Sequence, residues 1–168
     1  KNFRLIIYIC VYNPKNFSCM INRELYMEQI TPFIDKPFVK VITGIRRCGK
    51  SVVLRLIREE LLRRGVSGDY IIYMNFESFE WIDMKEAKAL YAHIREATKA
   101  PGKYYILLDE IQEVTDWEKA VNAFLVDLDV DIYVTGSNSR LLSSEFSTYL
   151  AGRYVAFHIM TLSFREYL

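Results

Sequence analysis

The stretch that decides the fold of this chain is Gly44-Ile45-Arg46-Arg47-Cys48-Gly49-Lys50-Ser51. It fits G-x-x-x-x-G-K-[ST], the consensus of a phosphate-binding loop, or P-loop. The two glycines let the backbone turn so that its N–H groups face a concavity that suits phosphate oxygens. Lys50 can reach the β- and γ-phosphates of a nucleotide, and the Ser51 hydroxyl can bind Mg²⁺. We therefore expect nine residues to hold the phosphates: Gly44, Ile45, Arg46, Arg47, Cys48, Gly49, Lys50, Ser51 and Val52.

The flanking sequence supports a P-loop over an ordinary glycine-containing surface turn. Residues 38–43 are mostly β-branched or apolar, which is typical of a buried strand. Residues 51–64 carry apolar side chains at helical spacing. A strand followed by the loop and then by a helix is the context in which this motif binds phosphate.

Strands and helices alternate along the rest of the chain. This alternation is typical of α/β proteins with a parallel sheet, and ligands of such sheets lie outside the carboxyl ends of the strands. Besides the P-loop, polar residues follow predicted strands at 75–77, 109–110 and 135–138. The predicted strands span residues 38–43, 70–76, 104–108, 131–135 and 154–160, and the main predicted helices span 22–34, 51–64, 84–99 and 117–126. A broken helix is expected at 139–150, and a further helix is expected to start at Ser163.

The third predicted strand ends in Asp109-Glu110, which matches the Walker B pattern of two carboxylates after an apolar run. Asp109 is expected to hold Mg²⁺ together with Ser51. Glu110 is expected to polarise the water that attacks the γ-phosphate. An apolar strand that runs into an acidic turn is common by itself. Its occurrence downstream of a P-loop is what favours a Walker B motif here. Hydrolysis of ATP is the favoured chemistry.

Composition narrows the class of protein. A length of 168 residues favours one domain, and 51% hydrophobic residues argue against disorder. The net charge of +1 does not favour nucleic acid as a partner, although Arg46, Arg47 and the basic N-terminal third leave that open. No apolar run is long enough to cross a membrane. Three cysteines without metal or disulfide spacing favour a cytoplasmic protein.

With these motifs in place, the chain resembles an AAA-type P-loop ATPase family of bacteria and archaea. The resemblance implies ATP and Mg²⁺ as ligands, and a three-layer fold with a five-stranded parallel sheet of order 5-1-4-3-2 and helices on both faces. It rests on residues 43–51 together with five further phrases: Asn75-Phe76-Glu77, Leu108-Asp109-Glu110-Ile111-Gln112, Thr135-Gly136-Ser137-Asn138-Ser139, Leu150-Ala151-Gly152-Arg153 and Leu162-Ser163-Phe164-Arg165-Glu166.

The resemblance also implies three further roles for polar residues. Asn138, or alternatively Ser137, would be the sensor that touches the γ-phosphate, although either could simply cap a helix. Arg153 would complete the site of a neighbouring copy as an arginine finger, which requires a homo-oligomer; an ordinary surface arginine is the competing interpretation. Glu77 would position water or Mg²⁺, or cap a helix.

The expected domain organisation is a core at residues 20–168 preceded by an N-terminal extension at 1–19 that is not part of the working domain. Met20 resembles a start, and the family's usual helical lid and C-terminal domain are missing after Leu168. The first functional hypothesis is an Mg²⁺-dependent ATPase. The second is a nucleotide-binding switch or truncated remnant with negligible turnover. Neither the task that hydrolysis drives nor a protein partner follows from the sequence.

Overall fold

The computed structural model describes residues 23–137, 141 and 149–162. Its centre is one five-stranded sheet of order β2-β3-β4-β1-β5, in which every neighbouring pair is parallel. This confirms the expected fold and strand order. The strands are β1 (Val39–Gly44), β2 (Ile71–Asn75), β3 (Tyr104–Asp109), β4 (Val130–Gly136) and β5 (Tyr154–Ile159).

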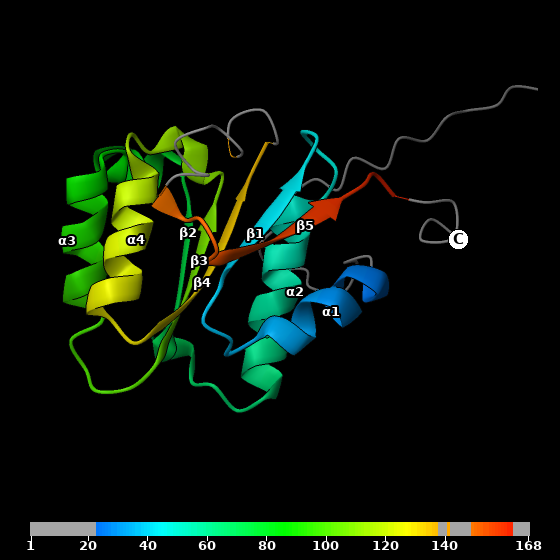
Figure 1. Ribbon diagram of the computed structural model, residues 1–168, viewed down its shortest axis with the longest axis horizontal. Helices are drawn as coiled ribbons and strands as arrows, with labels where there is room; N and C mark the ends of the chain where they lie inside the picture. Colours follow the sequence, from blue (N-terminus) through cyan, green and yellow to red (C-terminus); the bar gives the residue numbers. More distant parts are fainter. Residues whose placement is uncertain (1–22, 138–140, 142–148, 163–168) are drawn as a thin grey trace, which may run out of the picture.

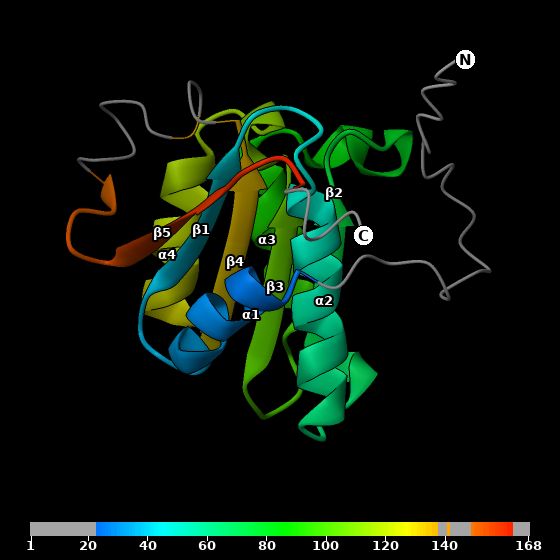
Figure 2. The same cartoon turned by 90° about the vertical axis from the view of Figure 1, so that its right-hand side faces the viewer.

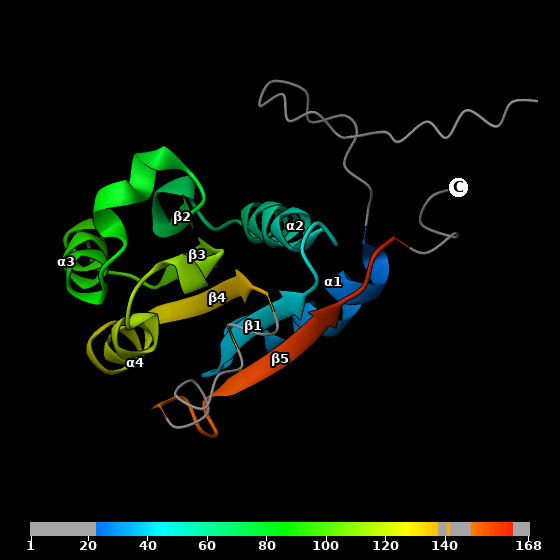
Figure 3. The same ribbon diagram turned by 90° about the horizontal axis from the view of Figure 1, so that it is seen from above.

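Helices cover both faces of the sheet, which gives three layers (Figure 1). The view from above separates α3 and α4 on one side from α1 and α2 on the other (Figure 3). Figure 2 shows α1 and α2 lying over the sheet from their side. The helices are α1 (Glu24–Ile30), α2 (Lys50–Arg63), α3 (Ala87–Ala97) and α4 (Trp117–Asp127).

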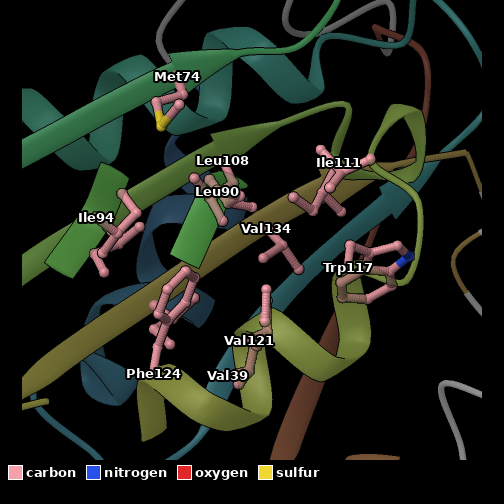
Figure 4. Close-up of a cluster of buried hydrophobic side chains, with 14 of the residues drawn as sticks. Val39, Met74, Leu90, Ile94, Leu108, Ile111, Trp117, Val121, Phe124 and Val134 are labelled. Atoms are coloured by element: carbon pink, nitrogen blue, oxygen red, sulfur yellow. The ribbon is translucent and has the colours of Figure 1, made fainter. Parts of the chain in front are cut away.

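Alternating side chains of the central strands build two cores. In β3, Ile106 and Leu108 pack into the cluster under α3 and α4, where Figure 4 shows Leu108 beside Leu90. Leu107 points the other way, into the cluster under α2 that also contains Ile57. Every residue of β3 is buried, because a parallel sheet with helices on both faces exposes neither side of its central strands.

The predicted third helix is wrong at its start. Residues 84–86 precede α3: Met84 ends a 3-10 helix (Phe79–Met84), and Glu86 is extended. Glu86 forms an isolated parallel bridge with Thr115, and the Ala87 N–H donates to the Thr115 carbonyl at 3.1 Å. This pairing takes backbone groups that a longer helix would have used.

Two predicted features lie outside the described residues, namely the N-terminal extension at 1–19 and the helix expected from Ser163 onward. Most of the broken helix expected at 139–150 lies outside them as well. In the described ranges, no helix has the length and apolarity that crossing a bilayer requires.

A buried ionic network closes the sheet at the amino ends of β1 and β4. The Lys40 ammonium pairs with Asp131 Oδ1 and donates to the Lys36 carbonyl at 2.8 Å. Asp131 Oδ2 accepts hydrogen bonds from the Tyr133 hydroxyl at 2.9 Å and the Asp35 N–H at 2.8 Å. Burial lowers the pKa of Lys40 and raises the pKa of Tyr133. The network fixes the linker after α1 to the sheet.

Candidate nucleotide site

The P-loop connects the end of β1 to the start of α2 and turns sharply between them. Arg47 and Gly49 have φ values of 65° and 102°, in the left-handed region that reverses the chain direction. At Gly44 the constraint is space, since a Cβ there would lie 2.4 Å from the Ile159 carbonyl oxygen and 2.6 Å from Cys48 Sγ. The loop therefore needs glycine at Gly44 for close packing against β5 and at Gly49 for backbone conformation.

Lys50 links the P-loop to the Walker B carboxylate. It is the first residue of α2, and only 3% of its side chain is exposed. Its Nζ donates to the Ile45 carbonyl at 3.3 Å and lies 3.3 Å from Glu110 Oε1. The structure thus brings together the cation predicted for the phosphates and the carboxylate predicted for the water.

Asp109 is the last residue of β3 and is fully buried. The hydroxyl of Thr135, on the adjacent β4, donates to its Oδ1 at 2.5 Å. The hydroxyl of Tyr73, on β2, donates to its Oδ2 at 3.0 Å. Two neighbouring strands therefore fix the orientation of the carboxylate. Sequence analysis included Thr135 in the polar segment 135–138 but did not predict its contact with Asp109, and it did not single out Tyr73.

Glu110 sits just beyond the end of β3 with a φ of 55°, so the backbone turns sharply there. Its N–H donates to Thr135 Oγ1 at 3.0 Å, and its Oε2 accepts from Gln112 Nε2 at 2.6 Å. Thr135 thus binds both residues of the Walker B pair. Since 14% of the Glu110 side chain is exposed, this carboxylate is open to a ligand, whereas Asp109 is enclosed.

Comparison with known proteins identifies the family. A family model described as "AAA domain" matches residues 36–168. The chain belongs to this AAA-domain family. The match includes the P-loop, Asp109 and Glu110, and with the fold it defines the chain as a nucleotide-binding AAA core.

Two relatives extend the similarity beyond the family model. An uncharacterized protein of Haemophilus influenzae is 48% identical over 154 residues, which cover 90% of this chain and 38% of that protein. An uncharacterized protein of Methanocaldococcus jannaschii is 34% identical over 149 residues, covering 89% of this chain and 31% of that protein. The chain therefore spans well under half the length of these relatives.

Similarity to solved structures agrees with the fold. The crystal structure of a DNA replication initiation factor matches with a TM-score of 0.54 at 19% sequence identity. The match covers 89% of this chain and 51% of that one. At this level of identity the similarity concerns the AAA fold alone.

Arg23 is a further contact of the AAA P-loop, and sequence analysis did not single it out. It is 1% exposed, and its guanidinium donates to the Cys48 carbonyl at 2.9 Å and to the Met160 carbonyl at 2.8 Å. The Met160 N–H in turn donates to the Tyr26 hydroxyl at 3.0 Å. Arg23 thus connects the start of α1, the P-loop and the residue that follows β5. A single arginine at the start of the helix predicted for residues 22–34 carries no motif that could have revealed this.

The donor set of the site fits Mg²⁺. The carboxylate of Asp109 and the hydroxyl of Ser51, which lies in the first turn of α2, are the hard oxygen ligands that this ion prefers. Within the described part of the chain, no group of three or more His, Cys, Asp or Glu side chains forms a separate metal cage. Mg²⁺ sites in proteins commonly use one or two carboxylates and complete their coordination with phosphates and water.

The remaining loop residues differ in exposure. Ile45 is 60% exposed, and Arg46 forms an exposed ion pair with Glu77 at 3.4 Å. Cys48 is buried, and Val52 lies in the first turn of α2. Glu77 is therefore near the loop, and its role in positioning water or metal stays a prediction.

Of the two sensor candidates, the structure describes Ser137. Asn138 lies outside the described residues. Ser137 follows β4 at the correct end of the sheet, and its carbonyl accepts a hydrogen bond from the Leu141 N–H at 3.0 Å. A sensor role for Asn138 or Ser137 stays a prediction.

Arg153 lies at the opposite end of the sheet from the P-loop. Its carbonyl accepts from the N–H of Val39, the first residue of β1, and its guanidinium donates to Asn122 of α4 at 3.1 Å. The six residues of β1, about 20 Å at the usual rise, separate it from the site of its own chain. Its predicted finger role therefore requires the site of another copy.

Proposed function

We propose that this AAA core binds Mg·ATP and hydrolyses it to ADP and phosphate. The observation that carries the proposal is the convergence of Lys50, Glu110 and Asp109 at the carboxyl ends of β1 and β3, with Lys50 Nζ 3.3 Å from Glu110 Oε1. A buried lysine beside a phosphate-binding turn suits the triphosphate. A more exposed carboxylate next to it suits the attacking water.

Each residue has a defined task in this proposal. The N–H groups of the P-loop and the Lys50 ammonium bind the β- and γ-phosphates, which draws Lys50 away from Glu110. Ser51 and Asp109 would hold Mg²⁺, and the ion would supply the positive charge that offsets the charge of the phosphate oxygens. Glu110 accepts a proton from water as the water oxygen attacks the γ-phosphorus. The bond from that phosphorus to the β–γ bridging oxygen breaks, and ADP leaves.

The proposal also includes residues outside the Walker motifs. The sensor, Asn138 or Ser137, would bind the γ-phosphate, and Arg153 would act on the site of a second copy in a homo-oligomer. A cytoplasmic location, the protein partner and the task that hydrolysis drives stay predictions for the whole protein, of which the chain spans a part.

The test is steady-state ATP hydrolysis by the chain and by Glu110→Gln, together with direct titration of Mg·ATP. We expect Glu110→Gln to lower kcat by about 100-fold or more, since general-base catalysis contributes about 10²–10⁴, while ATP affinity stays within twofold. Glu113→Gln, in the same turn, is the matched control and should behave as the unmodified chain.

A chain that binds ATP and shows no difference between wild type and Glu110→Gln would support the alternative of a nucleotide switch without turnover. A chain that binds no ATP at all would contradict both the ATPase proposal and the nucleotide-switch alternative.

A further inference from the structure

Beyond the residues of the Walker motifs, we propose that Gln112 is a positioning residue that holds the Glu110 carboxylate in place for its reaction with water. The inference deepens the proposed function and rests on it. The contact is direct: Gln112 Nε2 donates to Glu110 Oε2 at 2.6 Å. The hydrogen bond of the Gln112 side chain is with Glu110, so its proposed action on the reaction is through Glu110.

The geometry of the turn makes this contact specific. Glu110 adopts a left-handed φ of 55°, and residues Ile111–Glu113 form a 3-10 turn directly after it. The turn is closed by the Glu113 N–H donating to the Glu110 carbonyl at 3.1 Å. Residues two apart in a regular α-helix do not face each other, and here the turn brings the Gln112 amide onto the Glu110 carboxylate.

Nucleotide binding makes the Gln112 contact more important. Glu110 has two side-chain partners among the described residues, Lys50 at Oε1 and Gln112 at Oε2. In the proposed function the phosphates draw Lys50 away. Gln112 is then the side chain that keeps the carboxylate oriented toward the water.

The amide oxygen of Gln112 argues against a purely structural role for this residue. Its Oε1 is buried and has no hydrogen-bond partner in the part of the chain that the structure describes. A buried acceptor without a partner costs free energy, and an apolar side chain of the same shape would avoid that cost. The contact of the amide nitrogen with Glu110 accounts for a glutamine at this position.

Gly136 provides the space that Gln112 occupies. A Cβ at Gly136, the last residue of β4, would lie 2.1 Å from Gln112 Oε1 and 2.4 Å from Leu141 Cδ1. Its backbone has no positive φ that would itself require glycine. The glycine of the Thr135-Gly136-Ser137-Asn138 phrase is therefore explained by the position of Gln112 and Leu141.

The test compares kcat, KM and directly titrated ATP affinity for Gln112→Met, Gln112→Glu and Gly136→Ala. Gln112→Met keeps the shape of the side chain and removes the donor, and Gln112→Glu replaces the donor with a second carboxylate. We expect both to lower kcat by about ten- to a hundred-fold, as for a misplaced catalytic group, with ATP affinity within twofold. Glu113→Gln is the control in the same turn and should leave all three quantities unchanged.

A double variant separates positioning from general damage. Since Gly136→Ala should break the same hydrogen bond by displacing the Gln112 amide, Gln112→Met combined with Gly136→Ala should be no slower than the slower single variant. Thermal unfolding of each variant checks that the fold is kept. If Gly136→Ala fails to fold, the two Gln112 variants decide the matter.

The outcomes distinguish this inference from the proposed function. If Glu110→Gln abolishes turnover while both Gln112 variants keep kcat within twofold of wild type, Gln112 is not a positioning residue and the ATPase proposal stands. Equal losses of kcat and ATP affinity in the Gln112 variants would also overturn the inference, because they would indicate a distorted site. If Glu110→Gln matches wild type, both proposals fail.

Discussion

A lysine and a carboxylate are paired at each end of the parallel sheet, and the pairs Lys40–Asp131 and Lys50–Glu110 differ in how far they are enclosed. At the amino ends, Lys40 and Asp131 have side chains 0% and 1% exposed. At the carboxyl ends, Lys50 and Glu110 are 3% and 14% exposed, with the two charged groups 3.3 Å apart. Similar chemistry thus occurs in a closed and in an open setting.

The difference lies in the partners of each charge. Asp131 Oδ2 accepts from Tyr133 and from the Asp35 backbone, so the closed pair is satisfied by the protein itself. Glu110 lies beyond the end of its strand, and Lys50 begins a helix after a turn of backbone N–H groups. A buried ion pair contributes to structure when all its partners are fixed. The open pair can exchange partners, which is what binding a triphosphate requires.

The largest expected effect concerns the closed pair. Lys40→Met leaves the Asp131 carboxylate buried without its cation, and we expect a loss of about 3–5 kcal/mol in the free energy of unfolding. Lys50→Met should cost clearly less, because Glu110 keeps the Gln112 hydrogen bond and some exposure. Urea unfolding of both variants measures this. Equal losses of unfolding free energy in Lys40→Met and Lys50→Met would contradict the distinction between a closed and an open ion pair.

The sequence predicts the open end of the sheet better than the closed end. Periodicity and motif spacing give all five strands and the P-loop, because phosphate binding constrains neighbouring residues in one short segment. The family resemblance supplies the strand order. Tyr73, a partner of Asp109, lies on a separate strand and carries no local signal. Thr135 lies in the polar segment 135–138 that the sequence singles out, but its hydrogen bonds with Asp109 and Glu110 join separate strands and do not follow from the sequence. The Lys40–Asp131 pair joins residues far apart in the chain, and no sequence motif predicts it.

Arg23 should give the next largest effect, because it fixes the open end from outside the motifs. Arg23→Met removes two hydrogen bonds to the carbonyls of Cys48 and Met160 from a buried cation. Charge-assisted bonds contribute about 1.5–3 kcal/mol each, so we expect the variant to bind ATP about tenfold more weakly and to melt at a lower temperature. Calorimetric titration and thermal unfolding measure both quantities. A lower melting temperature with unchanged ATP affinity would restrict Arg23 to a structural role.

The smallest expected effect lies on the surface of α2. Hydrogen bonds from Arg63 and Arg64 lower the pKa of Glu60 from its ordinary 4.5 to about 2. A lowered carboxylate pKa stabilises the fold above the unfolded pKa, and this contribution is lost as pH falls from 4.5 toward 2. Because the cluster is solvated, Glu60→Gln should cost at most about 1 kcal/mol at pH 7.

The measurement for Glu60 is a pair of unfolding curves at each pH. The difference between wild type and Glu60→Gln should shrink steadily below pH 4.5. A difference that stays constant down to pH 2 would show that the carboxylate charge does not contribute. ATP affinity should be the same in both proteins, since Glu60 lies far along α2 from the P-loop.

The central claim is that the open pair at the carboxyl ends of the strands is a nucleotide site, and Mg·ATP titration of the chain and of Lys50→Ala tests it most directly. We predict saturable binding to the chain, and binding at least about tenfold weaker to Lys50→Ala, since the lysine is the main cation for the phosphates. Circular dichroism of both proteins should confirm that they are equally folded. Equal ATP affinity in the two folded proteins would contradict the account.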